Sequence, residues 1–238
     1  MLNIQLLAAK LMAHVKTAGF LGAVDHTVRQ VMKEGMRRLN PVQDEFDIRY
    51  GTDTGGFINL WKYRIESPNA KYGVSYGTTS EQHIEVLLSP LPRSASFVDL
   101  GCGKGRPLLV AAAMGFKTVI GVEFVRELVE VAKENLRKTR ANAMVVCADA
   151  ACYEFPAGPL VVYLYNPFNA AVVSSVAQKL RLHEGELWVI YINPKHNGLF
   201  EFWMERMSLT PTQARLFSPE SVSIWHKVFP NDPKESSI

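Results

Sequence analysis

Residues 97–115 read FVDLGCGKGRPLLVAAAMG and join a short apolar run to a helical pattern with proline in its first turn. We expect a buried strand over 96–100 and a helix over 107–114. Three glycines stand on alternate positions between them: Gly101, Gly103 and Gly105. Glycine lets the backbone turn sharply and places no side chain between the main chain and a ligand. The stretch therefore predicts a strand, a ligand-binding turn and a helix.

The sequence beyond this stretch alternates between strand and helix patterns. Further strands are expected over 118–122, 143–148, 160–165 and 186–192. The segment after the first of these carries an apolar stripe at helical spacing: Val125, Leu128, Val129, Ala132 and Leu136. Helices are also expected from about residue 79 and after residue 167. Such alternation predicts right-handed crossovers and a doubly wound, mostly parallel α/β sheet.

The end of the chain departs from this alternation. After a helix expected over about 199–207, residues 208–229 read SLTPTQARLFSPESVSIWHKVF. This stretch suggests two extended runs separated by Ser218, Pro219 and Glu220, which is typical of a hairpin. Together with the five preceding strands, it predicts a seven-stranded sheet that ends in an antiparallel hairpin.

The N-terminal part has a different character. Residues 2–18 and 25–39 suggest helices, whereas 41–77 are rich in glycine, tyrosine, aspartate and threonine without a sustained period. We expect a structured loop or a cap with short strands there, and its stretch YGTDTGG, 50–56, is either a lid or a connector. The expected organisation is an N-terminal helical and loop extension, a core and a flexible tail: 1–78, 79–230 and 231–238.

Composition places the chain among ordinary globular proteins. Its 238 residues are 47% hydrophobic and 21% charged, and the formal net charge of +3 is too small to indicate nucleic-acid binding. An excess of positive charge in residues 1–40 suits a solvated helix face, an acidic partner or a membrane surface. The three cysteines lack metal-site or disulfide spacing, and no apolar block resembles a signal peptide or a membrane span. We expect a cytoplasmic protein without a metal.

The glycine turn fits neither of two common nucleotide motifs. A dinucleotide fingerprint would need its third glycine where Arg106 stands, and a phosphate loop would need Ser or Thr after its Gly-Lys pair. The stretch VDLGCGKG, 98–105, instead resembles the first motif of class I S-adenosylmethionine-dependent methyltransferases. The resemblance covers about 79–229 and implies a Rossmann-like methyltransferase with S-adenosylmethionine as cofactor. It implies that Asp99 lies by the methionine ammonium and that the turn, Cys102 included, packs against the cofactor.

Two further acids follow the next strands. Glu123 closes the second strand in VIGVEF, and Asp149 follows the third in VVCADA. The resemblance implies that Glu123 accepts the ribose hydroxyls and that Asp149 receives the adenine amino group, with neighbouring Phe124 and Ala150 also in contact. An isolated acid at such a position could equally cap a helix or belong to a solvated turn. Three acids at the ends of three consecutive strands favour cofactor binding.

The fourth strand leads into VVYLYNPFNA, 161–170, which resembles a motif of methyltransferases that act on nitrogen. Although it has only one proline, it is similar to N/D-P-P-Y/F and to the Asn-Asn-Phe stretch of non-SET lysine methyltransferases. The resemblance implies that Asn166, Pro167 and Phe168 orient a nitrogen acceptor. Alternatively, Asn-Pro simply ends the strand. A protein amine or amide is the expected acceptor, ahead of a small molecule and RNA, and a cofactor-binding protein without methyl transfer is a further alternative.

A weaker resemblance lies just before the core. The stretch KYGVSYGTTSEQHIEVLL, 71–88, is similar to the segment that covers the methionine end of the cofactor in seven-strand lysine methyltransferases. It implies that Tyr76 and Thr79 contact the cofactor, although both prolines of the family pattern are missing. Thr79 or Ser80 could instead only cap the helix that follows.

Overall fold

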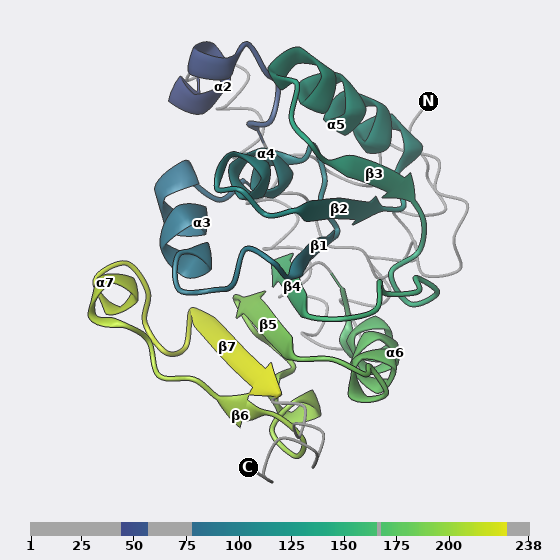
Figure 1. Cartoon of the computed structure of the whole chain (residues 1–238), viewed down its shortest axis with the longest axis vertical. Helices are drawn as coiled ribbons and strands as arrows, with labels where there is room; N and C mark the ends of the chain where they lie inside the picture. The colour runs from purple at the N-terminus through teal and green to yellow at the C-terminus, as the bar shows by residue number, and fades with distance from the viewer. Residues whose placement is uncertain (1–43, 57–77, 166–167, 228–238) are drawn as a thin grey trace, which may run out of the picture.

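A computed structural model describes residues 44–56, 78–165 and 168–227 of the chain (Figure 1). It contains a seven-stranded sheet with the strand order β3-β2-β1-β4-β5-β7-β6. The strands are β1 (Ser96–Leu100), β2 (Thr118–Glu123), β3 (Met144–Cys147), β4 (Leu160–Tyr165), β5 (Leu187–Ile192), β6 (Glu205–Arg206) and β7 (Val222–Lys227). The first five are parallel, and β7 runs antiparallel to β5 and β6. The expected doubly wound fold with an antiparallel end is confirmed.

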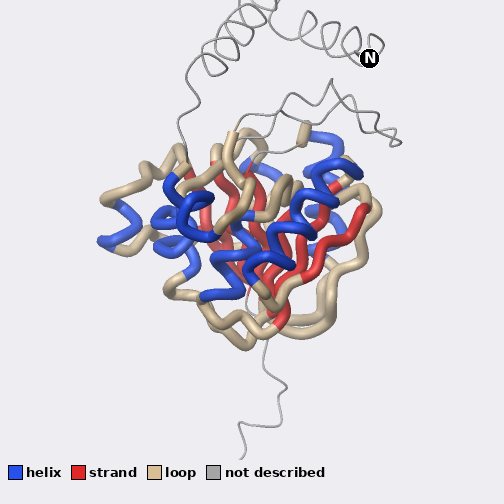
Figure 2. The backbone as a smooth tube through the Cα atoms, turned by 90° about the horizontal axis from the view of Figure 1, so that it is seen from above, coloured by secondary structure: helices blue, strands red, loops and turns tan. Residues whose placement is uncertain are grey.

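Helices cover both faces of the sheet (Figure 2). They are α2 (Glu45–Tyr50), α3 (Glu81–Leu88), α4 (Arg106–Ala113), α5 (Arg126–Thr139), α6 (Ala170–Arg181) and α7 (Pro211–Ala214), with a short 3-10 helix η3 (Asn197–Leu199). The apolar residues of α3 and α4 pack on one face, and those of α6 pack on the other. Within the described ranges, no helix combines the length and the apolar character needed to cross a bilayer.

The central strands bury both of their faces. In β1, Phe97 belongs to the core beneath α3 and α4, whereas Val98 and Leu100 belong to the core beneath α6. This alternation follows from the pleat of a strand, and the continuous apolar sequence follows from having helices on both sides. The stripe expected on α5 is also buried, from Val125 to Leu136.

The prediction for the C-terminal part was partly wrong. Instead of a helix over 199–207, the chain forms η3, a series of turns and the two-residue strand β6, which pairs with Trp225 and His226 of β7. The first run of the expected hairpin contains α7 rather than a strand. Thr210 and Gln213 form a reciprocal capping box that starts α7, which is a signal readable in the sequence.

The N-terminal predictions are tested only in part. Within 41–77, where loops or short strands were expected, the structure has the helix α2, which Asp44 caps by accepting a hydrogen bond from the Phe46 amide. The helices expected over 2–18 and 25–39 and the tail 231–238 lie outside the described residues. The proposed boundaries at 78 and 230 therefore stay predictions.

Candidate functional site

Three acids lie at one edge of the sheet. Asp99 is the penultimate residue of β1, Glu123 is the last residue of β2, and Asp149 follows β3 by two positions. Because β3, β2 and β1 are parallel neighbours, their carboxyl ends meet at this edge. In open α/β sheets this is the edge that binds ligands.

The glycine turn leaves β1 at the same edge. Gly101, Gly103 and Gly105 all have positive φ, at 77°, 54° and 87°, so each has a conformation that side-chain-bearing residues rarely adopt. The amides of Gly101 and Cys102 both donate to the carbonyl of Val122, at 2.8 and 3.1 Å. The three glycines are therefore required by the shape of the turn, and the main chain is left bare towards the sheet edge.

Glu123 holds this turn from the side of β2. One carboxylate oxygen accepts a hydrogen bond from the Gly103 amide at 3.0 Å, and the other accepts one from the Val125 amide at 2.9 Å. Burial raises the pKa of Glu123 to about 7, although the backbone hydrogen bonds act in the opposite direction. Glu123 thus fixes the turn, a role that its position in the sequence did not reveal.

Asp99 is the least satisfied polar group of the site. Its side chain is 3% exposed, and Oδ2 has no hydrogen-bond partner among the described residues. Burial raises the pKa of Asp99 well above its ordinary value, and the nearby Glu123 raises it further. Because a buried carboxylate without a partner is unfavourable, the site is suited to a ligand that supplies a positive charge or a donor.

A hollow beside the turn completes the site. It is open to solvent and is lined by Gly101, Val122, Phe124, Ala148, Asp149, Ala150, Phe168 and Val172. Its walls are mostly apolar, with the Asp149 carboxylate as the charged group. Asp149 also accepts a hydrogen bond from the Ala151 amide at 2.9 Å, as expected for a turn residue. An apolar slot with one acceptor suits a flat heterocycle that carries an amino group.

The structure places several predicted site residues together. Gly101, Phe124, Asp149, Ala150 and Phe168 all line the hollow. Asp99, Gly103, Gly105 and Glu123 belong to the adjoining turn and strand ends. Asn166, Pro167 and Tyr76 lie outside the described residues, so their assigned roles stay predictions.

Two predicted residues are placed differently from the rest. The Cys102 side chain is 1% exposed and packs in the core under α4, where burial raises the pKa of its thiol, so only its main chain is left for a ligand. The Thr79 hydroxyl accepts a hydrogen bond from the Tyr163 hydroxyl at 3.4 Å, while Ser80 caps α3. Thr79 is not among the residues that line the hollow.

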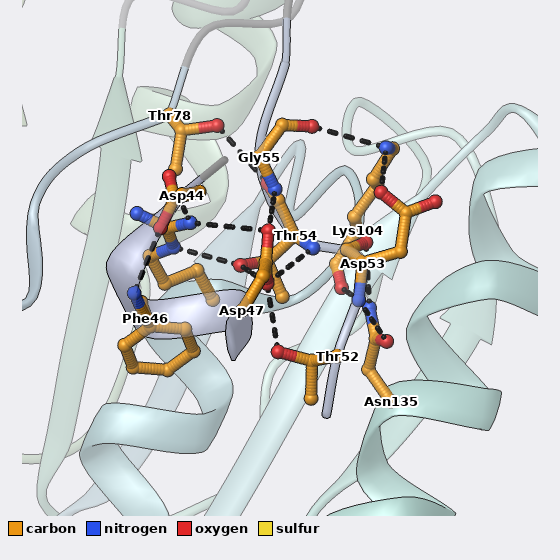
Figure 3. A network of polar contacts seen from close by, with 11 residues as sticks. Asp44, Phe46, Asp47, Thr52, Asp53, Thr54, Gly55, Thr78, Lys104 and Asn135 are labelled. Carbon is orange, nitrogen blue, oxygen red and sulfur yellow. Dashed lines mark hydrogen bonds and ion pairs between the residues drawn. The ribbon is translucent and has the colours of Figure 1, made fainter. Parts of the chain in front are cut away.

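Sequence reasoning missed the partners of the turn on its other side. Lys104, Arg106 and Asn135 form hydrogen bonds and ion pairs with residues 44–56 (Figure 3). The stretch that was expected to be a lid or a connector is thus docked against the glycine turn. The clearest signal was Arg106, a charged residue followed by proline at the start of an apolar helix.

Comparison with known proteins agrees with this geometry. A family described as a methyltransferase domain matches residues 97–185. Ribosomal protein L11 methyltransferase of Thermotoga neapolitana is 32% identical over 83 residues, which are 35% of this chain and 31% of that protein. The chain therefore matches about a third of the length of this curated relative.

Two solved structures share the fold at low sequence identity. The PH0226 protein from Pyrococcus horikoshii OT3 superposes with a TM-score of 0.50 at 14% identity, covering 62% of this chain and 89% of that one. The glycopeptide N-methyltransferase MtfA also gives 0.50, at 12% identity, covering 64% and 91%. Residues 97–185 therefore match a methyltransferase domain, and the described core shares the Rossmann-like fold of these two structures.

Proposed function

We propose that this protein transfers a methyl group from S-adenosylmethionine to a nitrogen atom of a protein amine or amide. The buried Asp99 carboxylate, unpartnered among the described residues and beside a bare glycine turn, is the observation that carries the cofactor assignment. A cationic cofactor would satisfy Asp99, and the hollow lined by Phe124, Asp149 and Ala150 would take its adenine. Glu123 would accept the ribose hydroxyls through lone pairs that its two backbone hydrogen bonds leave free.

The chemistry asks mainly for positioning. The bound cofactor supplies a sulfonium methyl group with its leaving group already attached. The chain must hold the acceptor in line with that methyl group and exclude water, which lowers the entropic part of the barrier. An amine must also lose its proton first, and a dry pocket beside a positive charge lowers its pKa.

The proposal of a nitrogen acceptor is based on the segment after β4. Phe168 is 8% exposed and lines the hollow, so its aromatic ring lies between this segment and the proposed cofactor site. Asn166 and Pro167 precede it directly, and we propose that they bind and orient the acceptor nitrogen. The matching relative is named for methylation of a ribosomal protein, which supports a protein acceptor. The N-terminal extension, 1–78, would shape the acceptor pocket, with Tyr76 and Thr79 near the methionine end of the cofactor.

Binding and transfer are tested in sequence on the full chain. Calorimetry with S-adenosylhomocysteine, with NAD as the comparison ligand, tests the cofactor. Methyl-labelled S-adenosylmethionine and a cell lysate then show whether label enters protein, RNA or the small-molecule fraction. Label in protein supports the proposal, whereas label in RNA or in the small-molecule fraction would show that the acceptor is of that class instead. Binding without any label transfer would indicate a cofactor-binding protein that is not an enzyme.

The role of Asn166 is tested separately. Asn166→Ala should leave affinity for S-adenosylhomocysteine almost unchanged while turnover falls by ~100-fold, as for the loss of a positioning contact. Asn142→Ala, at an exposed asparagine before β3, is the matched control and should change neither. Equal losses of affinity and turnover in Asn166→Ala would contradict an acceptor role.

A further inference from the structure

The segment 44–56 is a compact unit built around one carboxylate. Asp47 accepts hydrogen bonds from the Thr52 hydroxyl at 2.7 Å, from the Thr54 amide and hydroxyl at 2.8 and 2.7 Å, and from the Gly55 amide at 2.6 Å. Burial alone would raise the pKa of Asp47, but these hydrogen bonds lower it overall, so the carboxylate is ionised at neutral pH. The hydrogen bonds of Asp47 therefore give the segment a defined shape.

Arg106 joins this unit to the start of α4. Its guanidinium is buried, lies 4.7 Å from the centre of the Phe46 ring and forms an ion pair with Asp44 at 2.7 Å. Its Nε donates to the Thr54 hydroxyl at 2.8 Å. Because Arg106 directly follows Gly105, these contacts fix the point where the glycine turn enters the helix.

Asn135 and Lys104 join the unit to the middle of the turn. The Asn135 amide group donates to the carbonyls of Asp53 and Lys104, both at 2.9 Å, and its oxygen accepts from the Asp53 amide at 2.9 Å. The Lys104 ammonium donates to Asp53 at 2.5 Å and to the Gly55 carbonyl at 3.0 Å. Lys104 stands between Gly103 and Gly105. Its side chain therefore ties the turn directly to Asp53 and Gly55, and its carbonyl ties the turn to Asp53 through Asn135 (Figure 3).

The glycine turn is thus held by two separate parts of the chain. Glu123 binds the Gly103 amide from β2, and the segment 44–56 binds Lys104 and Arg106 from the N-terminal side. A turn of three glycines has many accessible conformations when no other residue holds it. If only a fraction of the molecules has the turn in the binding conformation, the apparent affinity for the ligand falls by that fraction.

We propose that the segment 44–56 is a positioning element for the cofactor turn, and that its docking is coupled to cofactor binding. This inference rests on the proposed function, because S-adenosylmethionine is the ligand of the turn. Lys104, Arg106 and Asn135 are its positioning residues. Coupling is reciprocal, so the cofactor must strengthen docking of the segment by the same factor by which docking strengthens cofactor binding.

Two variants of the full chain test the affinity side of the coupling. Lys104→Met removes both contacts of the ammonium but keeps the backbone hydrogen bond, and Asn135→Leu removes the bridge from α5. Each should weaken S-adenosylhomocysteine binding by ~10-fold in calorimetry, within the usual range of coupling energies. Lys104→Arg should recover part of the affinity. Lys133→Met, at an exposed lysine of α5 whose ion pair is with Glu130, is the matched control and should bind normally.

Proteolysis tests the reciprocal side. Arg49, 58% exposed at its side chain and paired with Glu81, offers a tryptic bond inside the segment, and cleavage there follows the undocked population. Saturating S-adenosylhomocysteine should slow cleavage after Arg49 by ~10-fold in the wild type and clearly less in Lys104→Met. Purely structural contacts would lower the unfolding midpoint and leave this ratio unchanged.

The outcomes separate the two proposals. If the wild type does not bind S-adenosylhomocysteine, the proposed function fails and this inference fails with it. If the wild type binds but Lys104→Met binds equally well, or if ligand leaves cleavage after Arg49 unchanged, only the coupling is wrong. Should Asn135→Leu fail to fold, Lys104→Met, at a lysine whose partner Asp53 is 65% exposed at its side chain, decides the question alone.

Discussion

Ionisable groups are paired in one half of the sheet and unpaired in the other; we call the part around β5 and β7 the β5–β7 end and the part around β1 and β2 the β1–β2 end. At the β5–β7 end, His226 of β7 lies 3.0 Å from the Glu186 carboxylate and stacks on Trp188, and the Arg206 guanidinium donates to the Ser223 hydroxyl. At the β1–β2 end, neither Asp99 nor Glu123 forms an ion pair with any described residue, although both are buried.

This difference supports the proposed site at the β1–β2 end. A protein gains nothing in stability from burying two carboxylates without cations, since each raises the cost of ionising the other. Ionisable groups that serve only the fold are expected to be paired, as Glu186 and His226 are. The imbalance at Asp99 and Glu123 is therefore what a cationic ligand would relieve, and the following predictions test whether the two ends really differ in this way.

The largest effect is expected from pH. The pKa of Glu123 is raised from 4.5 to about 7, so its contribution to stability is fully present below about pH 4.5 and is lost as pH rises through about 7. This corresponds to about 3 kcal/mol of unfolding free energy, and Asp99 acts in the same direction. Urea denaturation of the ligand-free protein between pH 5 and 8 should show stability falling as pH rises.

The variant Glu123→Gln isolates this contribution. It should flatten the pH dependence, because the side chain no longer ionises. Glu186→Gln, at the β5–β7 end, is the matched control and should keep the slope of the wild type. An equal slope in the wild type and Glu123→Gln would show that the buried acid is not the source.

The next effect concerns ligand affinity. Asp99→Asn keeps the size of the side chain but removes its charge, so S-adenosylmethionine should bind ~30-fold more weakly, or about 2 kcal/mol, as for a lost charge-assisted hydrogen bond. The ligand-free variant should be at least as stable as the wild type, because a buried charge is gone. Calorimetry and thermal unfolding measure the two quantities. Unchanged affinity would remove Asp99 from the binding site.

A smaller effect is expected beneath the turn. A methyl group at Gly121 of β2 would lie 2.6 Å from both Cys102 Sγ and Leu108 Cδ1. Gly121→Ala should therefore lower the unfolding free energy by about 1–2 kcal/mol, as in other overpacked cores, and should displace the turn. Adding Cys102→Ala should recover part of this loss. A double-mutant cycle in urea would measure the recovery, and strictly additive losses would contradict the contact.

The sequence was most informative where local pattern and burial agree. The strands on either side of the glycine turn are buried on both faces, so their apolar runs are continuous and their ends are marked by Asp99 and Glu123. These two acids could be placed at one edge because parallel strands end together. The hydrogen bond between Glu123 and the Gly103 amide could not be predicted, because it depends on the three-dimensional shape of the turn.

The sequence was least informative where distant segments decide the structure. Asn135 would be assigned to the polar face of α5, yet it is 1% exposed and bonds to Asp53, 82 positions away. The strand β6 has two residues and exists because β7 pairs with it, so its local sequence resembled a helix instead. Such contacts have no local period that could be recognised in advance.

The smallest effect is expected at the paired end. Glu186 and His226 are 42% and 21% exposed at their side chains, and such pairs contribute between zero and about 1 kcal/mol. Glu186→Gln should therefore change the unfolding free energy by about 0.5 kcal/mol or less and leave S-adenosylhomocysteine affinity unchanged. Urea denaturation and calorimetry at one pH would measure both quantities. Glu186 precedes the amino end of β5, whereas the site lies at the carboxyl edge of the parallel strands, so Glu186 cannot contact the ligand. A loss of affinity comparable with that of Asp99→Asn would therefore mean that the two ends are coupled.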